Sequence, residues 1–579
     1  MIKNDMTFKI GGEAGQGVES SGAGFAQALA RGGLHIFGLQ DYMSRIRGGH
    51  NFYQIRVKEE DIYSHTDAVH LLLALNPQAI KEHMEEVVEG GGIIYDESWQ
   101  GEKRELEGRG IVPFPAPLKR IAEEEGGRKV MMNTAALGVA AGLTGYDFEP
   151  MASVIEDNFR KKGASVVERN LKVAETGYRF AQENHDRFGY RLETLEAPDR
   201  MVINGNHAFC LGAVASGCRF VSAYPMTPAT SIMEWMAAHA QQYGIVMKQS
   251  EDEIAAICMA IGAAHVGARA MTATSGGGFS LMVEALGLAG MTETPLVVVE
   301  AQRPGPSTGL ATRTEQGDLR FILHASQGEF PRLILAPGTV EECFQAGTRA
   351  FNLAEKYQCP VIVLLDNFLA NSLRAVDKGA FDFASVEIHR GEFLTSADLD
   401  RLEGQYNRFQ FTESGISPRA VPSHPKAVYT SAGNVHDEQG HITEEPTIRT
   451  KMMNKRMGKL EVARREMREP ELYGPKEADI TFLGWGSTYG PIREAVEALN
   501  KEGRKVNFIH FMDIWPLPWE KVAEIMEGAQ QTVAVENNYS GHMAGLIRIY
   551  TGREVDKRIL KYDGRPFSPD YIIAHLEVK

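Results

Sequence analysis

The chain has 579 residues, of which 43% are hydrophobic and 24% charged, and its formal charge is −15. A chain of this length is expected to form several domains with ordinary globular cores. The acidic balance argues against a nucleic-acid-binding protein, which needs a basic surface. The sequence has no apolar run of membrane-spanning length, and its start lacks the apolar segment of a signal peptide, so we expect a cytoplasmic protein.

Apolar, strand-like runs alternate with helical segments in three regions, residues 1–190, 201–375 and 475–579. This alternation predicts the α/β class, with doubly wound or Rossmann-like domains. In the first region we expect a largely parallel sheet. Residues 376–470 are rich in charge, Ser, His, Pro and Gly, which predicts an irregular arm between domains or around a partner.

The cysteines are scattered along the chain and form no Cys-x-x-Cys pair. This spacing disfavours both a disulfide framework and an iron–sulfur site within the chain. We expect small buried hydrophobic side chains instead. The five positions are Cys210, Cys218, Cys258, Cys343 and Cys359.

A first glycine turn, GGEAGQG, follows a strand-like run and precedes an Ala-rich helix, and it contains Gly15 and Gly17. Its spacing is not that of a dinucleotide fingerprint, so NAD is disfavoured. Together with Arg45 and Arg47 of SRIRGG, the turn suits a phosphorylated nucleotide, because amides at a helix start and arginines bind phosphates. A tight turn with surface arginines explains the pattern equally well.

Two further loops follow strand-like runs. Ser275 and Gly276 begin SGGG, where a ligand can approach the backbone closely. Arg303 lies among small and hydroxyl residues in QRPGPSTG, which suits a carboxylate ligand. A solvated arginine in a surface loop is the simpler alternative, and Thr227 in YPMTPAT, taken alone, is typical of a turn.

The stretch QSEDEIAAICMAIGAA places an acidic first turn before an apolar helix. Ser250 and Glu253 have the spacing of a capping box, and an acidic residue there also suits the helix dipole. A glutamate at the start of such a helix can in addition bond a heterocycle nitrogen. Glu253 can serve both purposes.

Residues 205–330 resemble the α subunit of 2-oxoacid:ferredoxin oxidoreductases through GNHAFCLGAVASG, AYPMTPATSIMEW, the Glu253 helix with SGGG, and RPGPSTGLATRTEQGDL. HDEQGHITEEPTIRTKMMNKR and ENNYSGHMAGLIR match the family as well. GGEAGQGV and RIRGGHN resemble its γ subunit, so nearly the whole chain is similar to a γ–α fusion. The sequence departs at Gly277, where proline is frequent, and at His542, where glutamine is frequent.

The resemblance implies a thiamine diphosphate pyrimidine-type domain at residues 201–375 and a transketolase C-terminal-like domain at residues 475–579. It implies that Glu253 holds the aminopyrimidine of the cofactor, while Thr227 and Arg303 hold the substrate carboxylate. Ser275 and Gly276 would lie beside the cofactor. In the γ-like domain, Gly15, Gly17, Arg45 and Arg47 are the candidate contacts for coenzyme A.

The sequence contains no Gly-Asp-Gly segment for diphosphate and Mg²⁺ and no set of cluster-ligating cysteines. A β subunit would therefore supply the Mg²⁺–diphosphate half of the site and a [4Fe–4S] cluster that passes electrons to ferredoxin. By analogy, the assembly would be α2β2. No metal ligand is expected in this chain.

The implied reaction is oxidative decarboxylation of a 2-oxoacid with coenzyme A, giving an acyl-CoA and CO2. The fused arrangement resembles enzymes that convert 2-oxoglutarate to succinyl-CoA. Pyruvate and branched-chain 2-oxoacids are the alternative substrates. Two further alternatives are a non-catalytic nucleotide-binding assembly subunit and a self-sufficient thiamine enzyme, the second of which the missing diphosphate motif disfavours.

Overall fold

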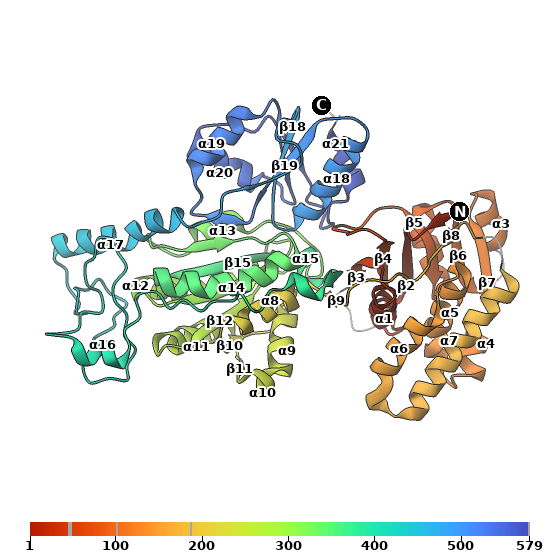
Figure 1. Ribbon diagram of the computed structural model, residues 1–579, viewed down its shortest axis with the longest axis horizontal. Helices are drawn as coiled ribbons and strands as arrows, with labels where there is room; N and C mark the ends of the chain where they lie inside the picture. Colours follow the sequence, from red (N-terminus) through yellow and green to blue (C-terminus); the bar gives the residue numbers. More distant parts are fainter. Residues whose placement is uncertain (44–48, 100–101, 186–187, 577–579) are drawn as a thin grey trace. The chain divides into compact units, whose positions relative to one another are not determined.

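The computed structural model describes residues 1–43, 49–99, 102–185 and 188–576. The chain forms two compact units, each assembled from segments that are separated in the sequence (Figure 1). Unit 1 comprises Met1–Asn204, Asn371–Ala380 and Ser568–Ala574. Unit 2 comprises Gly205–Ala370 and Phe381–Phe567, with the last residues from His575.

Unit 1 is built on a mixed eight-stranded sheet. Its strand order is β7 (Val112–Ala116), β6 (Val87–Asp96), β5 (Val69–Ala74), β2 (Met6–Glu13), β4 (His50–Lys58), β3 (His35–Asp41), β16 (Leu373–Asp377) and β9 (Arg200–Ile203). The pairs from β7 to β2 are parallel, but β4, β3, β16 and β9 pair antiparallel with their neighbours. The expectation of a largely parallel sheet is therefore wrong for half of this sheet, because β3 and β4 form an antiparallel pair instead of being joined through a helical crossover.

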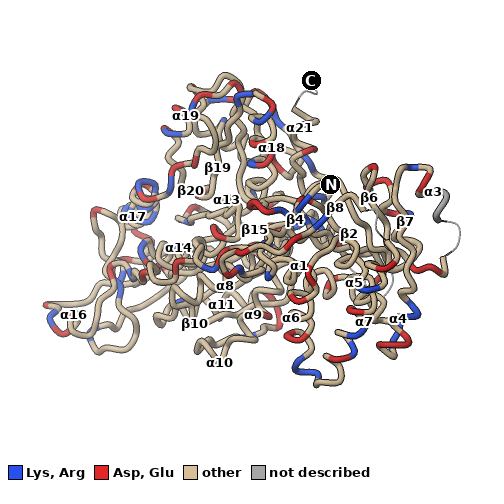
Figure 2. The backbone as a smooth tube through the Cα atoms, turned by 45° about the vertical axis from the view of Figure 1, so that its right-hand side comes forward, with Lys and Arg blue, Asp and Glu red and all other residues tan. Residues whose placement is uncertain are grey.

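Helices cover the unit 1 sheet and share an apolar core with its strands. They are α1 (Val18–Arg31), α2 (Pro77–His83), α3 (Glu102–Gly108), α4 (Leu118–Glu124), α5 (Met132–Thr144), α6 (Phe148–Phe159) and α7 (Ala164–Asn184). Helices α5 and α7 approach so closely that a side chain at Gly138 would collide with the backbone of Ala174. Charged residues of both signs lie along α4, α6 and α7 (Figure 2).

Unit 2 contains a seven-stranded sheet of which all but one strand are parallel. Its order is β11 (Val246–Gln249), β10 (Cys218–Ala223), β12 (Arg269–Thr274), β13 (Leu296–Gln302), β15 (Pro360–Asp366), β14 (Leu333–Leu335) and the antiparallel β20 (Asp513–Trp515). The helices between its strands are α8 (Gly205–Ala215), α9 (Thr230–Ala238), α10 (Ala240–Tyr243), α11 (Glu253–His265), α12 (Gly276–Met291), α13 (Leu319–His324), α14 (Val340–Tyr357) and α15 (Asn367–Asn371). The central strands β13 and β15 are buried along their whole length, as expected for a sheet covered on both faces, whereas the edge strand β11 is largely exposed.

The C-terminal region adds a second sheet to unit 2. Its order is β17 (Glu471–Tyr473), β19 (Val506–Phe511), β18 (Ile480–Trp485), β21 (Thr532–Glu536) and β22 (Lys557–Leu560). The helices between these strands are α18 (Tyr489–Lys501), α19 (Trp519–Gly528) and α20 (His542–Thr551). Helix α21 (Pro569–Leu576) ends the described chain. One apolar core joins residues of both sheets. The doubly wound α/β class expected from the sequence is confirmed for unit 2.

The segment 376–470 is not irregular throughout, because it contains the 19-residue helix α17 (Pro446–Arg464) and the short helix α16 (Ser396–Arg401). The expected boundary at residue 375 also falls inside β16, which belongs to the sheet of unit 1. Helix α17 buries cations: Lys455 donates to Glu293 at 2.6 Å, and Lys459 bonds the same carboxylate. Together these ion pairs attach α17 to the loop that follows α12.

In the part of the chain that the structure describes, no helix is long and apolar enough to cross a membrane.

Candidate active site

Four of the candidate residues follow the carboxyl ends of adjacent parallel strands of unit 2. Thr227 follows β10, Glu253 follows β11, Ser275 follows β12 and Arg303 follows β13. Because parallel strands end at one edge, the fold brings these residues to the same edge of the sheet, where ligands of open α/β sheets bind.

Glu253 is the first residue of α11 and is only 3% exposed. The N-cap of this helix is Asp252, whose side chain accepts a hydrogen bond from the N–H of Ala255 at 2.7 Å. The capping box expected from Ser250 is therefore wrong: β11 ends at Gln249, and the helix begins two residues later than that motif requires. Glu253 is consequently not needed for capping.

The Glu253 carboxylate lies against the first turn of α12. A side chain at Gly278 would place its Cβ 2.6 Å from Oε1 of Glu253 and 2.1 Å from Oγ1 of Thr274, so only glycine fits. Oε1 is buried, and no described residue forms a hydrogen bond with it. Burying a carboxylate oxygen without a donor is costly, which makes it a suitable partner for a ligand N–H group.

Ser275 and Gly276 form the start of α12. Ser275 is the N-cap residue, but its side chain does not cap the helix, and its buried hydroxyl has no partner in the described part of the chain. Gly276 allows Asp318 to approach, since a Cβ would lie 2.4 Å from Oδ2 of that residue. This turn therefore has unused polar groups close to Glu253.

Arg303 and Thr227 are in direct contact, because Nη1 of Arg303 donates to the carbonyl oxygen of Thr227 at 2.8 Å. Both residues are half-buried. The side chain of Asn206 supports the same loop by donating to the carbonyl oxygen of Pro228 at 2.9 Å. The guanidinium group is thus held at the sheet edge with donors left over for an anion.

Near Arg303 lie buried carboxyl groups that the sequence analysis missed. Glu300, the last acidic residue of β13, is fully buried, and burial together with the nearby Asp318 raises its pKa well above the usual range. Burial also raises the pKa of Asp318, and it raises the pKa of Glu315 to about 7. A carboxylate at the end of an apolar strand, as in VVVEAQR, was the available signal in the sequence.

The unit 1 candidates lie at the start of α1. Gly17 is its N-cap residue with φ of 72°, and Gly15 has φ of 97°, so both need glycine. A Cβ at Gly17 would lie 2.5 Å from the amide of Asn133. Arg45 and Arg47 lie outside the described residues, so this hypothesis has only its glycines in the structure.

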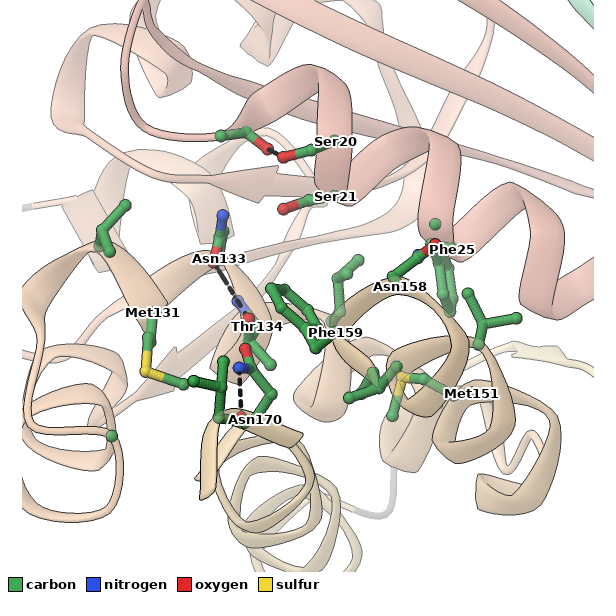
Figure 3. A pocket seen from close by; sticks show the side chains of 18 of the residues that line it. Ser20, Ser21, Phe25, Met131, Asn133, Thr134, Met151, Asn158, Phe159 and Asn170 are labelled. Atoms are coloured by element: carbon green, nitrogen blue, oxygen red, sulfur yellow. Dashed lines mark hydrogen bonds between the residues drawn. The ribbon is translucent and has the colours of Figure 1, made fainter. Parts of the chain in front are cut away.

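A pocket of about 660 Å³ extends from Gly17 along α1 (Figure 3). Phe25, Met131 and Met151 give it apolar walls, and the amides of Asn133, Asn158 and Asn170 lie around it. Its rim carries three exposed cations, and none of them pairs with a carboxylate among the residues described. These cations are Arg128, Lys162 and Arg169.

Among the described residues, no group of three or more His, Cys, Asp or Glu side chains is arranged to hold a metal ion. Four of the five cysteines, at positions 210, 218, 343 and 359, are buried. Burial raises the pKa of each of these four thiols, which makes them poor metal ligands.

The sequence matches three family descriptions. Residues 211–455 match "Pyruvate flavodoxin/ferredoxin oxidoreductase, thiamine diP-bdg", residues 7–180 match "Pyruvate ferredoxin/flavodoxin oxidoreductase", and residues 478–572 match "Pyruvate:ferredoxin oxidoreductase core domain II". The sheet edge with Glu253, Thr227 and Arg303 lies within the first of these ranges. The fold and the family match thus define an α/β oxidoreductase subunit with a thiamine diphosphate-binding domain.

Individual relatives specify the family further. The 2-oxoacid:ferredoxin oxidoreductase subunit alpha of a Sulfolobus species is 34% identical over 98% of this chain and 95% of its own length. The 2-oxoglutarate oxidoreductase subunit KorA of Mycobacterium tuberculosis is 30% identical over 94% of this chain and 87% of its own. The solved 2-oxoglutarate:ferredoxin oxidoreductase from Magnetococcus marinus, with 2-oxoglutarate, coenzyme A and succinyl-CoA bound, superposes with a TM-score of 0.92 at 33% identity, covering 99% of both chains. The chain belongs to the 2-oxoacid:ferredoxin oxidoreductase alpha-subunit family.

Proposed function

We propose that this chain provides the aminopyrimidine half of a thiamine diphosphate site and, with a partner subunit, oxidatively decarboxylates 2-oxoglutarate with coenzyme A. The observation that carries the proposal is the buried Oε1 of Glu253, which has no hydrogen-bond partner among the described residues and lies at the same sheet edge as Arg303. A cofactor ring and an anionic substrate would there meet a carboxylate and a guanidinium group, respectively.

Each residue has a role that follows from its chemistry. Thiamine diphosphate, when bound, supplies a nucleophilic carbon and an electron sink. Glu253 holds a proton at a ring nitrogen of the aminopyrimidine, since its free oxygen has no competing donor. Arg303 and Thr227 bind the substrate carboxylate, and Ser275 and Gly276 line the cofactor side of the site.

The choice of 2-oxoglutarate draws on the relatives. The Magnetococcus marinus structure contains 2-oxoglutarate and succinyl-CoA, and it matches 99% of this chain. The products here would be succinyl-CoA, CO2, one proton and two electrons, and the electrons pass to ferredoxin. Pyruvate is the alternative substrate, because all three family descriptions name it.

The proposed partner is a β subunit that carries Mg²⁺, the diphosphate half of the site and a [4Fe–4S] cluster, in an α2β2 assembly. Beside the site, α11 and α12 expose apolar side chains, with Ile254 and Leu281 each 51% exposed. Cys258, one turn after Ile254, is also exposed. An apolar surface of this kind next to half of a cofactor site suits a protein partner.

We also propose that unit 1 contacts coenzyme A through Gly15, Gly17, Arg45 and Arg47. The pocket that begins at Gly17 supports this proposal, because the cations on its rim have no carboxylate partner in the described part of the chain and suit phosphate groups, and its walls are apolar. The variant Arg169→Ala should then raise KM for coenzyme A. Replacing a neighbouring exposed lysine that does not line the pocket, Lys161→Ala, should leave KM unchanged.

The central test is the variant Glu253→Gln in the purified complex, with Glu251→Gln as its matched control. Glu251 is an exposed carboxylate two residues earlier. The assay is anaerobic, coenzyme A-dependent viologen reduction with 2-oxoglutarate or pyruvate. Glu253→Gln should abolish turnover with the fold intact, while Glu251→Gln stays active.

The outcomes separate the alternatives. An active Glu253→Gln complex would contradict the assigned role. Turnover by the unmodified complex with pyruvate alone would keep the mechanism and change the substrate. No turnover with any 2-oxoacid would favour a non-catalytic assembly subunit.

A further inference from the structure

Glu300 is a buried carboxyl group without a matching donor. It lies on β13 three residues before Arg303, its exposed fraction is 0%, and no N–H or hydroxyl group of the described chain donates to either of its oxygens. An ionised carboxylate in this environment would be strongly destabilised. Glu300 therefore has a structural reason to keep a proton.

The carboxylate of Asp318 is the acceptor for a hydrogen bond from that protonated group. Its Oδ2 lies against Gly276, and its backbone N–H donates to Oε1 of Gln302 at 3.0 Å, which fixes it beside β13. A protonated Glu300 donates a hydrogen bond to the Asp318 carboxylate, and this bond partly offsets the burial that raises the pKa of Asp318. The two carboxyl groups thus form a pair that favours one shared proton.

Arg303 is the cation whose charge acts on both members of the pair. Its guanidinium group is fixed on the other side by the bond to the carbonyl oxygen of Thr227. With one proton on the pair, Arg303 faces one negative charge. Loss of that proton doubles the negative charge beside Arg303, which opposes the approach of a substrate carboxylate.

We propose that Glu300 and Asp318 are positioning residues which retain one shared proton and thereby keep Arg303 available for the substrate carboxylate. This proposal rests on the proposed function of Arg303. By linkage, binding of the 2-oxoacid favours the protonated pair, so substrate affinity falls when the pair ionises at high pH.

Other charged groups also face the pair. Asp366 at the end of β15 acts on Glu300, and the charge of Asp318 acts on Glu315. Because the pKa of Glu315 is raised to about 7, Glu315 is the rival source of pH dependence near neutrality. Its own variant must therefore accompany those of the pair.

The test is the pH dependence of KM for 2-oxoglutarate in the purified complex, measured from about pH 6 to about pH 9. In the unmodified complex, KM should rise by up to about tenfold per pH unit above the ionisation, as expected for one linked proton. Glu300→Gln leaves only the charge of Asp318, and Asp318→Asn leaves only Glu300, which its burial keeps protonated. Neither variant can gain a second negative charge, so in both KM should vary less than about twofold, with kcat little changed. Glu342→Gln is the control, because Glu342 is a half-buried carboxylate on α14 whose partners are His510 and the N–H of Gly338.

A binding measurement provides a readout without turnover. Isothermal titration with glutarate, in two buffers of different ionisation enthalpy, should show proton uptake in the unmodified complex and none in Glu300→Gln. The proposal is overturned if both pair variants keep the original pH profile, if Glu315→Gln alone removes it, or if Glu342→Gln has the same effect. An inactive unmodified complex would instead contradict the proposed function.

Discussion

The fit of Gly278 beside the Glu253 carboxylate can be tested with a single methyl group. In Gly278→Ala, the added Cβ would lie 2.1 Å from Oγ1 of Thr274 and 2.6 Å from Oε1 of Glu253, and both residues are buried. The neighbouring Gly277 is the matched control, since its nearest atom would be the carbonyl oxygen of Ser307 at 3.8 Å. Both glycines lie in the first turn of α12.

The expected magnitude follows from the difference between the two variants. Replacing glycine by alanine in a helix gains up to about 1 kcal/mol, and this gain is common to both positions. Only Gly278→Ala adds overpacking, which costs about 1–3 kcal/mol. The methyl group must also displace the Glu253 carboxylate, and a misplacement of about 1 Å can reduce turnover by about 10²-fold.

The assay compares thermal unfolding and viologen reduction of the two purified complexes. Gly278→Ala should unfold at a lower temperature than Gly277→Ala and lose most of its turnover, whereas Gly277→Ala should remain close to the unmodified complex in unfolding temperature. Equal stability and equal activity of the two variants would refute the assignment of a tightly packed wall between Gly278 and Glu253.

Three further predictions concern stability. Asp252→Ala should destabilise the complex by about 1 kcal/mol through loss of the N-cap, while Ser250→Ala should not; equal effects would contradict the observed cap. Glu293→Gln should cost about 3–5 kcal/mol, because it leaves two buried lysines without their carboxylate; a drop in unfolding temperature no larger than for a surface Glu→Gln change would count against this. The pKa of Glu315 is raised from 4.5 to about 7, so between these pH values the folded state binds more protons than the unfolded state. The contribution of Glu315 to stability therefore falls as pH rises from 4.5 to about 7. Glu315→Gln should therefore raise the unfolding temperature at about pH 8 and leave it unchanged at about pH 4. A rise of equal size at both pH values would contradict a loss of stability through ionisation of Glu315.

The positions of the candidate residues on the sheet could be predicted, because they depend on local patterns. Apolar runs followed by glycine or polar loops indicate the ends of parallel strands, and strand ends share one edge. The contact between Arg303 and Thr227 is consistent with that expectation. The predicted start of α11 was two residues too early. Asp252 and Ser250 are both good N-cap residues, and local sequence does not show which of them caps the helix.

Other features depended on contacts that sequence patterns do not report. Helix α17 was missed because much of its buried face is cationic, including Lys455 and Lys459, which hydropathy periodicity scores as solvent-exposed. The pair of Glu300 and Asp318 was missed because the two carboxyl groups come from separate segments and meet only in the folded unit. Patterns of apolar residues cannot reveal a polar group that is buried against another polar group.

The discontinuity of unit 1 has a consequence for biosynthesis. In its sheet, β16 lies between β3 and β9, yet the ribosome must make every strand from β10 to β15 before it reaches Leu373. Until then, the edge of β3 lacks a neighbouring strand and can pair with another nascent chain. A fragment ending at Asn204 would keep this open edge permanently, so recombinant expression of this N-terminal fragment alone should yield aggregates unless residues 371–380 are supplied with it.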